Sequence, residues 1–427
     1  MKIIKNIFKV KGENSLNKKE GFKSRNIEIS GSLEKNIKLD YVYKFLSSID
    51  IGSAIWMLYL GYKGMSLIEI GILEAIHHGT SLLCEIPTGA LADLMGRKKS
   101  IVLGRLMSAM GAILMLTANS FIGFAIAFVI SPLSYNLNSG SEEALVYDSL
   151  KIIGKEEEYL KINGKLNFII EVAQGIAVLV GGILSDYSFG YSYVLAVIIS
   201  LCAFGVSLGF KEPDIHEDKK ERITIRNHFK ECHKVMKENK NLILMMMFFE
   251  GIFTVGSTTH FYSQQYFSNM GYSRSFIAII YVLASIGCAL AATQAYKVER
   301  KMKSHILYIV PILGGIFLLI IGGSAGIISI LGFIMFSVSI NILYPISSNY
   351  INKLIPSAQR ATLISVQSMF FSIFMIVVFP IIGVIGQFIS LEVTFIILAG
   401  ISIILGVLTK KRVTTKLSIN RAEKNVS

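Results

Sequence analysis

The stretch P-T-G-A-L-A-D-L-M-G-R-K-K-S, residues 87–100, leads from one apolar run, 67–93, into the next, 101–118. A helix needs about 20 mostly apolar residues to cross roughly 30 Å of hydrocarbon, and both runs are near that length. Their junction carries one carboxylate, two glycines and three basic residues. A short charged connection between two long apolar runs is typical of a helical hairpin at a membrane surface.

The same pattern continues along the whole chain. Lipid offers no partner to an open backbone, so each long apolar run is predicted to be a helix. We identify twelve predicted spans: 41–62, 67–93, 101–118, 121–147, 162–184, 191–210, 241–267, 275–296, 304–322, 326–350, 361–386 and 391–409. The sequence therefore predicts an all-α polytopic membrane protein.

Composition supports this class and excludes others. Of the 427 residues, 52% are hydrophobic and 17% charged, whereas a soluble domain carries about 25% charged residues. If the N-terminus is cytoplasmic, only Lys63 and Arg274 among the basic residues fall in outer loops. The net charge of +13 is then an orientation signal rather than a sign of nucleic-acid binding. It predicts a plasma-membrane protein with both termini cytoplasmic.

One polar interruption divides the spans into two sets of six. Ile225, Phe229, Cys232 and Met236 recur within it at helical spacing, so part of it is expected to be an amphipathic helix on the inner membrane face, the alternative being a solvated loop. The expected organisation is an N-terminal extension (1–40), a first bundle (41–210), a linker (211–240), a second bundle (241–410) and a cytoplasmic tail (411–427).

The stretch 87–100 resembles the signature loop of the major facilitator superfamily, roughly G-x-L-A-D-x-x-G-R-K-x-x. The matching residues are Gly89, Leu91, Ala92, Asp93, Gly96, Arg97 and Lys98. The resemblance implies two six-helix bundles around a central cavity. The overall pattern looks most like the drug:proton antiporters of that family, including multidrug and macrolide-type efflux permeases. Gly181 and Gly182 are similar to the end of the family's antiporter motif, although plain helix packing explains them equally well.

The signature loop is expected to act as a cytoplasmic gate. Gly89 would allow a close helix approach, and Gly96 a tight turn. Charged residues on neighbouring helices supply partners: Asp148 and one of two glutamates are expected to pair with Arg97, Lys98 or Arg105. The residues assigned to this gate are Gly89, Asp93, Gly96, Arg97, Lys98, Arg105, Glu142, Glu143 and Asp148. The alternative is that the basic residues only anchor the loop on the inner side.

Two carboxylates are expected near the bilayer midplane, about 15 Å into their helices. They are Asp50 and Glu250, at equivalent places in the two halves. Because a charge at that depth is costly, we expect both to face a common chamber and to couple proton and substrate movement. Glu74 and His78, one helical turn apart, form a second candidate for the proton path, with His77 expected to point elsewhere.

These features favour a secondary active exporter of hydrophobic or cationic small molecules. Met246 and Phe253 on the face of Glu250 would suit soft apolar ligands. No phosphate-binding loop of the G-x-x-x-x-G-K-[ST] type occurs, so a proton gradient is the expected energy source, with no cofactor. Four scattered cysteines give no metal or disulfide pattern. The expected partners are a small-molecule substrate, protons and the lipid bilayer, with the chain a monomer.

Three alternatives stay open at this stage. The first is a proton-coupled importer of a nutrient or metabolite, which the incomplete antiporter motif keeps in consideration. The other two are a polytopic membrane enzyme and a sensor that transports nothing. An enzyme should show clustered catalytic groups, but the seven histidines are dispersed, and no polar segment is long enough for the soluble domain of a sensor.

Overall fold

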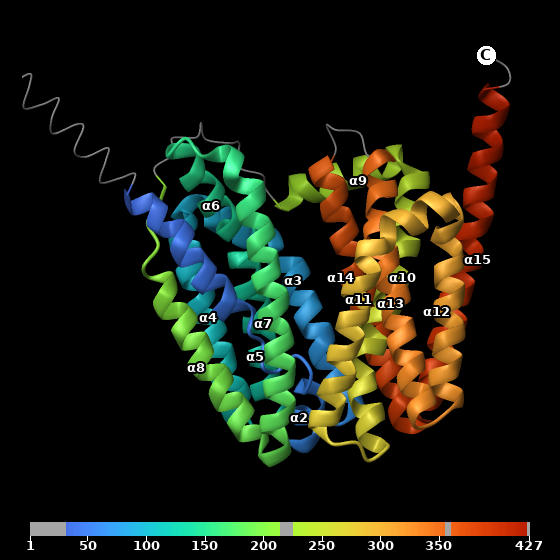
Figure 1. The fold of residues 1–427 in the computed structure, drawn as a ribbon, viewed down its shortest axis with the longest axis horizontal. Coiled ribbons are helices and arrows are strands. Elements are labelled where there is room, and N and C mark those ends of the chain that lie inside the picture. The colour runs from blue at the N-terminus through green and yellow to red at the C-terminus, as the bar shows by residue number, and fades with distance from the viewer. Residues whose placement is uncertain (1–30, 214–224, 355–359, 425–427) are drawn as a thin grey trace, which may run out of the picture.

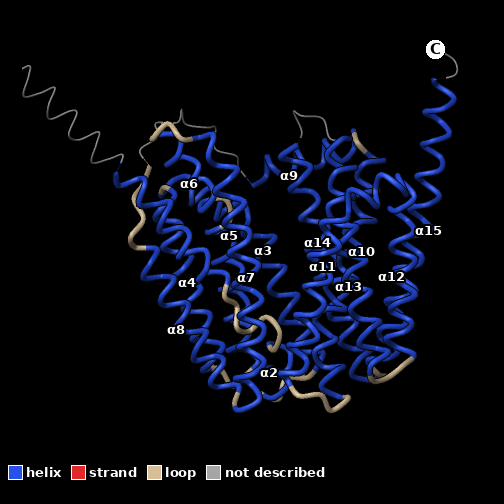
Figure 2. Tube along the Cα trace, viewed as in Figure 1, coloured by secondary structure: helices blue, strands red, loops and turns tan. Residues whose placement is uncertain are grey.

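The computed structural model describes residues 31–213, 225–354 and 360–424. Within these ranges every regular element is a helix and there is no strand (Figure 2). The opening MKIIKNIFKVK segment lies outside the described residues. The predicted all-α class is thus confirmed.

The helices form two groups, which we call the N-terminal and C-terminal bundles. The N-terminal bundle contains a helix over 31–48, α2 (Trp56–Tyr62), α3 (Leu67–Met95), α4 (Arg97–Thr117), α5 (Phe121–Asn138), α6 (Ser141–Ile152), α7 (Tyr159–Tyr187) and α8 (Phe189–Ser207). The linker contains α9 (Ile225–Glu238), and the C-terminal bundle contains α10 (Lys240–Asn269), α11 (Arg274–Met302), α12 (Ile306–Gly323), α13 (Ile327–Leu354), α14 (Arg360–Phe388) and α15 (Leu391–Lys424). Two 3₁₀ turns, η1 (Glu156–Glu158) and η2 (Lys303–His305), precede α7 and α12.

Among the described residues these helices correspond in number and order to the twelve predicted spans. Ten stretches are long and apolar enough to span a bilayer, and one of them, Arg274–Gly323, contains both α11 and α12. The remaining crossing is the first one, which is broken into the helix over 31–48 and α2. The twelve-helix architecture expected from the apolar runs is present.

Serine residues start several helices at one end of the bundles. Ser66 caps α3: its hydroxyl accepts from the Glu69 N–H at 3.2 Å, while the Glu69 carboxylate accepts from the Ser66 N–H at 2.8 Å. Such reciprocal bonds satisfy amides that a helix start would leave open. Ser120 and Ser273 cap α5 and α11 with their hydroxyls in the same way.

Two crossings predicted as continuous helices are interrupted. The first is non-helical over residues 49–55, so the prediction of one helix over 41–62 is wrong in its middle. The fourth changes from α5 to α6 at Ser139–Gly140, where Gly140 has φ of 77°, a backbone region that a Cβ disfavours. The first helix also includes residues 31–40, which were expected in the N-terminal extension.

The bundles lie side by side and meet at one end (Figure 1). α9 lies at the end we call the linker side, and α2 lies at the opposite end, the far side. Contacts between bundles run mainly between α3 and α14 and between α7 and α11. Glycines allow them: a Cβ at Gly383 would lie 2.5 Å from the Leu67 carbonyl oxygen, and one at Gly182 would lie 2.4 Å from the Ala278 Cβ.

We expect Gly181→Ala to destabilise the protein, because its Cβ would lie 2.3 Å from the carbonyl oxygen of Ile51 in the broken first helix. Overpacking of this kind costs about 1–3 kcal/mol. The measurement is thermal unfolding of the purified protein in detergent. Gly175→Ala on the same helix is the matched control, because its Cβ would meet nothing within 4 Å. Equal melting temperatures for the two variants would contradict the packing assigned to Gly181.

Candidate functional site

A cavity of about 780 Å³ lies within the N-terminal bundle. It extends from the break in the first helix, at Asp50, to Glu142 on α6 at the linker side. Phe261 is its one lining residue from the C-terminal bundle. Hydroxyl groups dominate the polar lining, which includes Ser47, Ser48, Ser53, Ser108, Ser131, Ser134, Ser139 and Ser200 together with Asn138 and Gln174. Such a wall offers many hydrogen bonds to a polar solute.

Asp50 lies at the floor of this cavity and is exposed to it. The carboxylate accepts a bond from the Gly52 N–H at 3.0 Å. Among the described residues no basic side chain forms an ion pair with Asp50. Because the first helix is unwound here, the carboxylate projects from a loop rather than from a regular helical face.

An aromatic group lies beside this carboxylate. The ring of Trp56 is 5.7 Å from that of Phe128 and 5.3 Å from that of Phe261, measured between centroids. All three residues line the cavity. They present apolar ring surfaces below the polar wall and join the N-terminal bundle to α10. A solute with a flat or ring-shaped part could stack on them.

The second predicted acid, Glu74, also lines the cavity. His78 Nε2 lies 3.4 Å from Glu74 Oε1, as the one-turn spacing predicts. The expectation for His77 is wrong, however, because His77 is the histidine that lines the cavity. The His78 ring packs against Phe371 of α14 at 5.5 Å instead.

Glu250 is placed differently from Asp50. Its carboxylate accepts a bond at 2.6 Å from the amide Nε2 of Gln367 on α14, and the residue is 6% exposed. Glu250 is not among the residues that line the cavity. Its neighbours Met246 and Phe253 are packed in a hydrophobic core cluster. The expected soft apolar surface on this helix is therefore absent from the cavity, because packing of the C-terminal bundle covers it.

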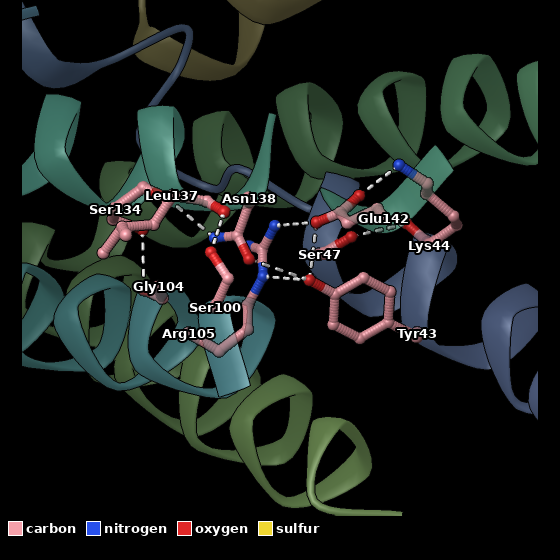
Figure 3. A network of polar contacts seen from close by, with 10 residues as sticks. All are labelled: Tyr43, Lys44, Ser47, Ser100, Gly104, Arg105, Ser134, Leu137, Asn138 and Glu142. Atoms are coloured by element: carbon pink, nitrogen blue, oxygen red, sulfur yellow. Dashed lines mark hydrogen bonds and ion pairs between the residues drawn. The ribbon is translucent and has the colours of Figure 1, made fainter. Parts of the chain in front are cut away.

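Three charged groups meet at the linker end of the cavity (Figure 3). Glu142 Oε1 accepts from Arg105 Nη2 at 2.9 Å and from the Tyr43 hydroxyl at 2.6 Å, and its other oxygen pairs with Lys44. Arg105 Nε also donates to the Tyr43 oxygen at 2.6 Å. One carboxylate is thus held by two cations, and a buried charge needs such partners.

Neutral groups extend this network into α5. Asn138 lies next to Tyr43 (hydroxyl to Oδ1 3.4 Å) and donates to the Ser134 carbonyl at 2.8 Å. The Ser134 and Ser100 hydroxyls donate across to carbonyls of α4 and α5 at 2.8 and 2.6 Å. These bonds fix α4 and α5 together beside the charges. The pairing of Arg105 with a glutamate was expected from the sequence, but nothing in it singled out Tyr43 or Lys44.

The signature loop has an unexpected partner, Glu212. Its carboxylate accepts from the backbone N–H groups of Arg97 and Lys98, each at 2.7 Å, and so caps the N-terminus of α4. Gly96, with φ of 90°, makes room, since a Cβ there would lie 2.7 Å from Glu212 Oε1. Arg97 Nε lies 3.8 Å from Asp148 Oδ2, a pairing that the sequence had suggested.

Two residues of the signature loop, Asp93 and Gly89, lie in the last turns of α3. Asp93 ends up in the last turn of α3, but its side chain lies outside the described part of the structure. Gly89 is exposed, and a Cβ there would meet nothing within 4 Å. The expected close helix approach at Gly89 is therefore wrong for this conformation, because the linker-side half of α3 has no neighbour at that point.

Asn36, on the helix over 31–48, bonds the backbone next to Glu212, the residue that caps α4. Asn36, 1% exposed, donates to the Lys211 carbonyl and accepts from the Lys211 N–H, both at 2.8 Å. It also donates to the Ser149 hydroxyl of α6 at 3.0 Å. Since Lys211 precedes Glu212, these bonds hold the α4 cap against the first helix and α6.

On the far side, hydrogen bonds connect the two bundles. Asp186 at the end of α7 accepts from the N–H groups of Arg274 and Ser275 at 2.8 and 3.1 Å, which caps α11 of the other bundle. Gln264 of α10 donates to the Ser53 carbonyl at 3.0 Å, and the Gln387 side chain accepts from the N–H of Ile68 at 3.2 Å. The far side is therefore closed while the cavity extends to the linker side.

We expect Glu142→Gln to lower stability strongly, since Lys44 and Arg105 would lose their carboxylate. Removing one partner from a buried charge group costs about 3–5 kcal/mol. Glu143→Gln is the matched control: the neighbouring glutamate also lines the cavity but is exposed. Thermal unfolding in detergent should separate the two variants by many degrees, and similar losses would refute the role given to Glu142.

The fold and the polar-lined cavity are those of a polytopic membrane transporter. A model of the Major Facilitator Superfamily matches residues 42–344, and the chain belongs to this family. Membership makes the chain a transporter and not an enzyme.

Two proteins of similar sequence are transporters of the same family by name. The MFS-type transporter YxaM of Bacillus subtilis (strain 168) is 24% identical over 371 residues, which is 84% of this chain and 91% of the relative. The MFS-type transporter MJ1560 of Methanocaldococcus jannaschii is 25% identical over 180 residues, 40% of this chain and 46% of the relative.

Two solved structures share the fold. The nucleoside transporter NupG matches with a TM-score of 0.70 at 13% identity, over 90% of this chain and 98% of its own. A D-xylose-proton symporter matches with a TM-score of 0.65 at 13% identity, over 88% and 96%. At these identities the likeness concerns the fold alone.

Proposed function

We propose that the chain imports a small polar solute, a nutrient or metabolite, together with protons by alternating access. One observation carries the proposal: a cavity walled by hydroxyl and amide side chains ends at the Asp50 carboxylate, which no basic side chain of the described residues neutralises. Such a site supplies both solute recognition and a group for ion coupling.

The chemistry of the wall favours a polar solute over a hydrophobic drug. Eight serines line the cavity, whereas the Met246 and Phe253 side chains that suggested a drug site are packed in a core cluster. Each serine can donate and accept a hydrogen bond. The structural neighbours named as a nucleoside transporter and a D-xylose-proton symporter take hydroxylated solutes by their names, which agrees with this proposal.

Asp50 is the group we assign to proton coupling. An ionised carboxylate near the bilayer centre costs at least about 2.5–3.5 kcal/mol unless water or a cation accompanies it. In the conformation open to the linker side, the cavity supplies water. When that side closes, a bound proton would remove the charge, so the proton and the solute would cross together. Glu74 with His77 and His78 is a second group on the same path.

The linker side is assigned to the cytoplasm, and the plasma membrane is the expected location. Basic residues are concentrated at the linker-side ends of the helices and in the linker, as the positive-inside rule requires of cytoplasmic segments. We take the monomer as the functional unit, since one chain contains the cavity and the contacts that close its far side.

Export of aromatic or cationic compounds is the second candidate. The observation in its favour is the ring cluster of Trp56, Phe128 and Phe261 beside two acids, Asp50 and Glu74. The direction of flux against an imposed proton gradient separates the two candidates.

The test uses purified protein in proteoliposomes with radiolabelled uridine and D-xylose as probes. We expect an inward proton gradient to accumulate at least one probe and a protonophore to abolish the accumulation. Asp50→Asn should reduce accumulation at least about tenfold, while exchange of the same probe across the membrane persists, since the solute wall is intact.

Glu157→Gln, at an exposed position in η1, is the control and should behave as wild type. Accumulation by Asp50→Asn equal to that of wild type would contradict the coupling role. Proton-driven extrusion of a dye such as ethidium, with no accumulation of either polar probe, would favour export instead.

A further inference from the structure

The break in the first helix has the form of an ion site. The helix over 31–48 ends and α2 begins only at Trp56; between them the backbone forms turns, in which the Ser53 N–H donates to the Asp50 carbonyl at 3.2 Å and the Ile55 N–H to the Gly52 carbonyl at 2.9 Å. An interrupted membrane helix frees carbonyl oxygens, and the C-terminal end of its first half carries a partial negative charge. Here that end leads directly into Asp50.

Two side-chain oxygens face the same point in this break. A Cβ built on Gly52 would lie 3.3 Å from Asp50 Oδ1 and 3.8 Å from the Tyr193 hydroxyl. Both residues line the cavity. The Tyr193 hydroxyl has no hydrogen-bond partner, so the two oxygens are not bonded to each other, and the missing Cβ of Gly52 leaves space next to both.

The Tyr193 hydroxyl is held there without a partner. Tyr193 is 4% exposed, and its hydroxyl has no hydrogen-bond partner in the described structure. Its ring lies against that of Tyr59 with centroids 3.9 Å apart, which restricts its movement. Buried polar groups are nearly always bonded, so an exception needs an explanation. Asp50, for its part, has no basic partner among the described residues.

We propose that the break binds a sodium ion through the Asp50 carboxylate, the Tyr193 hydroxyl oxygen and a backbone carbonyl oxygen of the break. Hard cations prefer oxygen ligands, and this ligand set contains only oxygen. A single carboxylate balances a single positive charge. The described residues contain no cluster of three His, Cys, Asp or Glu side chains for a metal ion, which argues for a monovalent rather than a divalent ion.

This site goes beyond the proposed function, in which Asp50 binds the coupling proton. A carboxylate that holds sodium cannot hold a proton at the same time, so the two ions compete for it. Sodium entering from the cavity would neutralise the carboxylate as a proton does. The inference does not depend on which solute is carried.

The test is binding of radioactive ²²Na⁺ to the purified full-length protein, measured by scintillation proximity in choline chloride at constant ionic strength. We expect saturable binding, displaced by unlabelled Na⁺ and not by K⁺. Asp50→Asn should weaken it at least about tenfold. Gly52→Ala should do the same without altering any ligand, since its methyl group would occupy the gap. Tyr193→Phe, which removes one ligand, should weaken binding about three- to tenfold.

Two control variants separate the site from general damage. Tyr59→Phe removes the hydroxyl from the ring stacked on Tyr193, but that hydroxyl donates to the Met115 carbonyl at 2.7 Å and not to the break. Gly79→Ala adds a Cβ that would meet nothing within 4 Å. Both should bind sodium as wild type does.

Trp56, the single tryptophan of the chain, gives an independent signal. Its backbone N–H donates to the Gly52 carbonyl at 2.9 Å and its ring lines the cavity, so a saturable change in its fluorescence should follow sodium and disappear in Gly52→Ala. Absence of ²²Na⁺ binding to wild type, or equal binding by wild type, Asp50→Asn and Gly52→Ala, would overturn the proposal. Because no solute is present, a failure of the uptake assay would leave this result unaffected.

Discussion

Backbone that is not hydrogen-bonded within a helix is tolerated at membrane depth only where protein or water surrounds it. The break at residues 49–55 meets this condition on all sides. Gly181 brings the backbone of α7 against Ile51, the Gln264 amide bonds the Ser53 carbonyl, and the Asp50 carboxylate accepts from the Gly52 N–H. The remaining side opens to the cavity. Close packing around the break therefore stabilises it, and a change in that packing would destabilise it.

The two bundles differ in chemistry although they match in architecture. The N-terminal bundle contains the cavity, the charged group around Glu142 and the carboxylate of Asp50. The corresponding acid of the C-terminal bundle, Glu250, is bonded to Gln367 and packed dry. In this conformation the N-terminal bundle supplies all but one of the residues that line the cavity, and the C-terminal bundle supplies Phe261. The two sets of six helices are thus alike in architecture and different in the chemistry of their acidic residues.

The sequence was sufficient for the class of fold, because twelve apolar runs leave few other structures in a bilayer. It was sufficient for the pairing of Arg105 with a glutamate, since both lie at the linker-side ends of neighbouring helices. It was not sufficient for the break at Asp50. The run 41–62 is long enough to cross a bilayer as one helix, and its one glycine before Gly61, Gly52, is not by itself a signal for a break. Glu212 and Asn36 were missed for another reason: each depends on contacts between segments more than a hundred residues apart.

The closing contacts are of a strength that alternating access requires. On the far side, Asp186 caps α11 across the bundle boundary, whereas on the linker side Glu212 caps α4 within one bundle. If the bundles tilt relative to each other, as in alternating access, only the contacts between bundles, such as that of Asp186, have to break. A hydrogen bond to a charged group contributes about 1.5–3 kcal/mol and a neutral one about 0.5–1.5 kcal/mol. The cross-bundle bonds of Asp186, Gln264 and Gln387 therefore amount to several kcal/mol, the range over which a bound ion and solute can shift an equilibrium between two states. In the alternating access proposed above, the far side would have to lose only these bonds to open, whereas the α4 cap lies within one bundle and would not have to break.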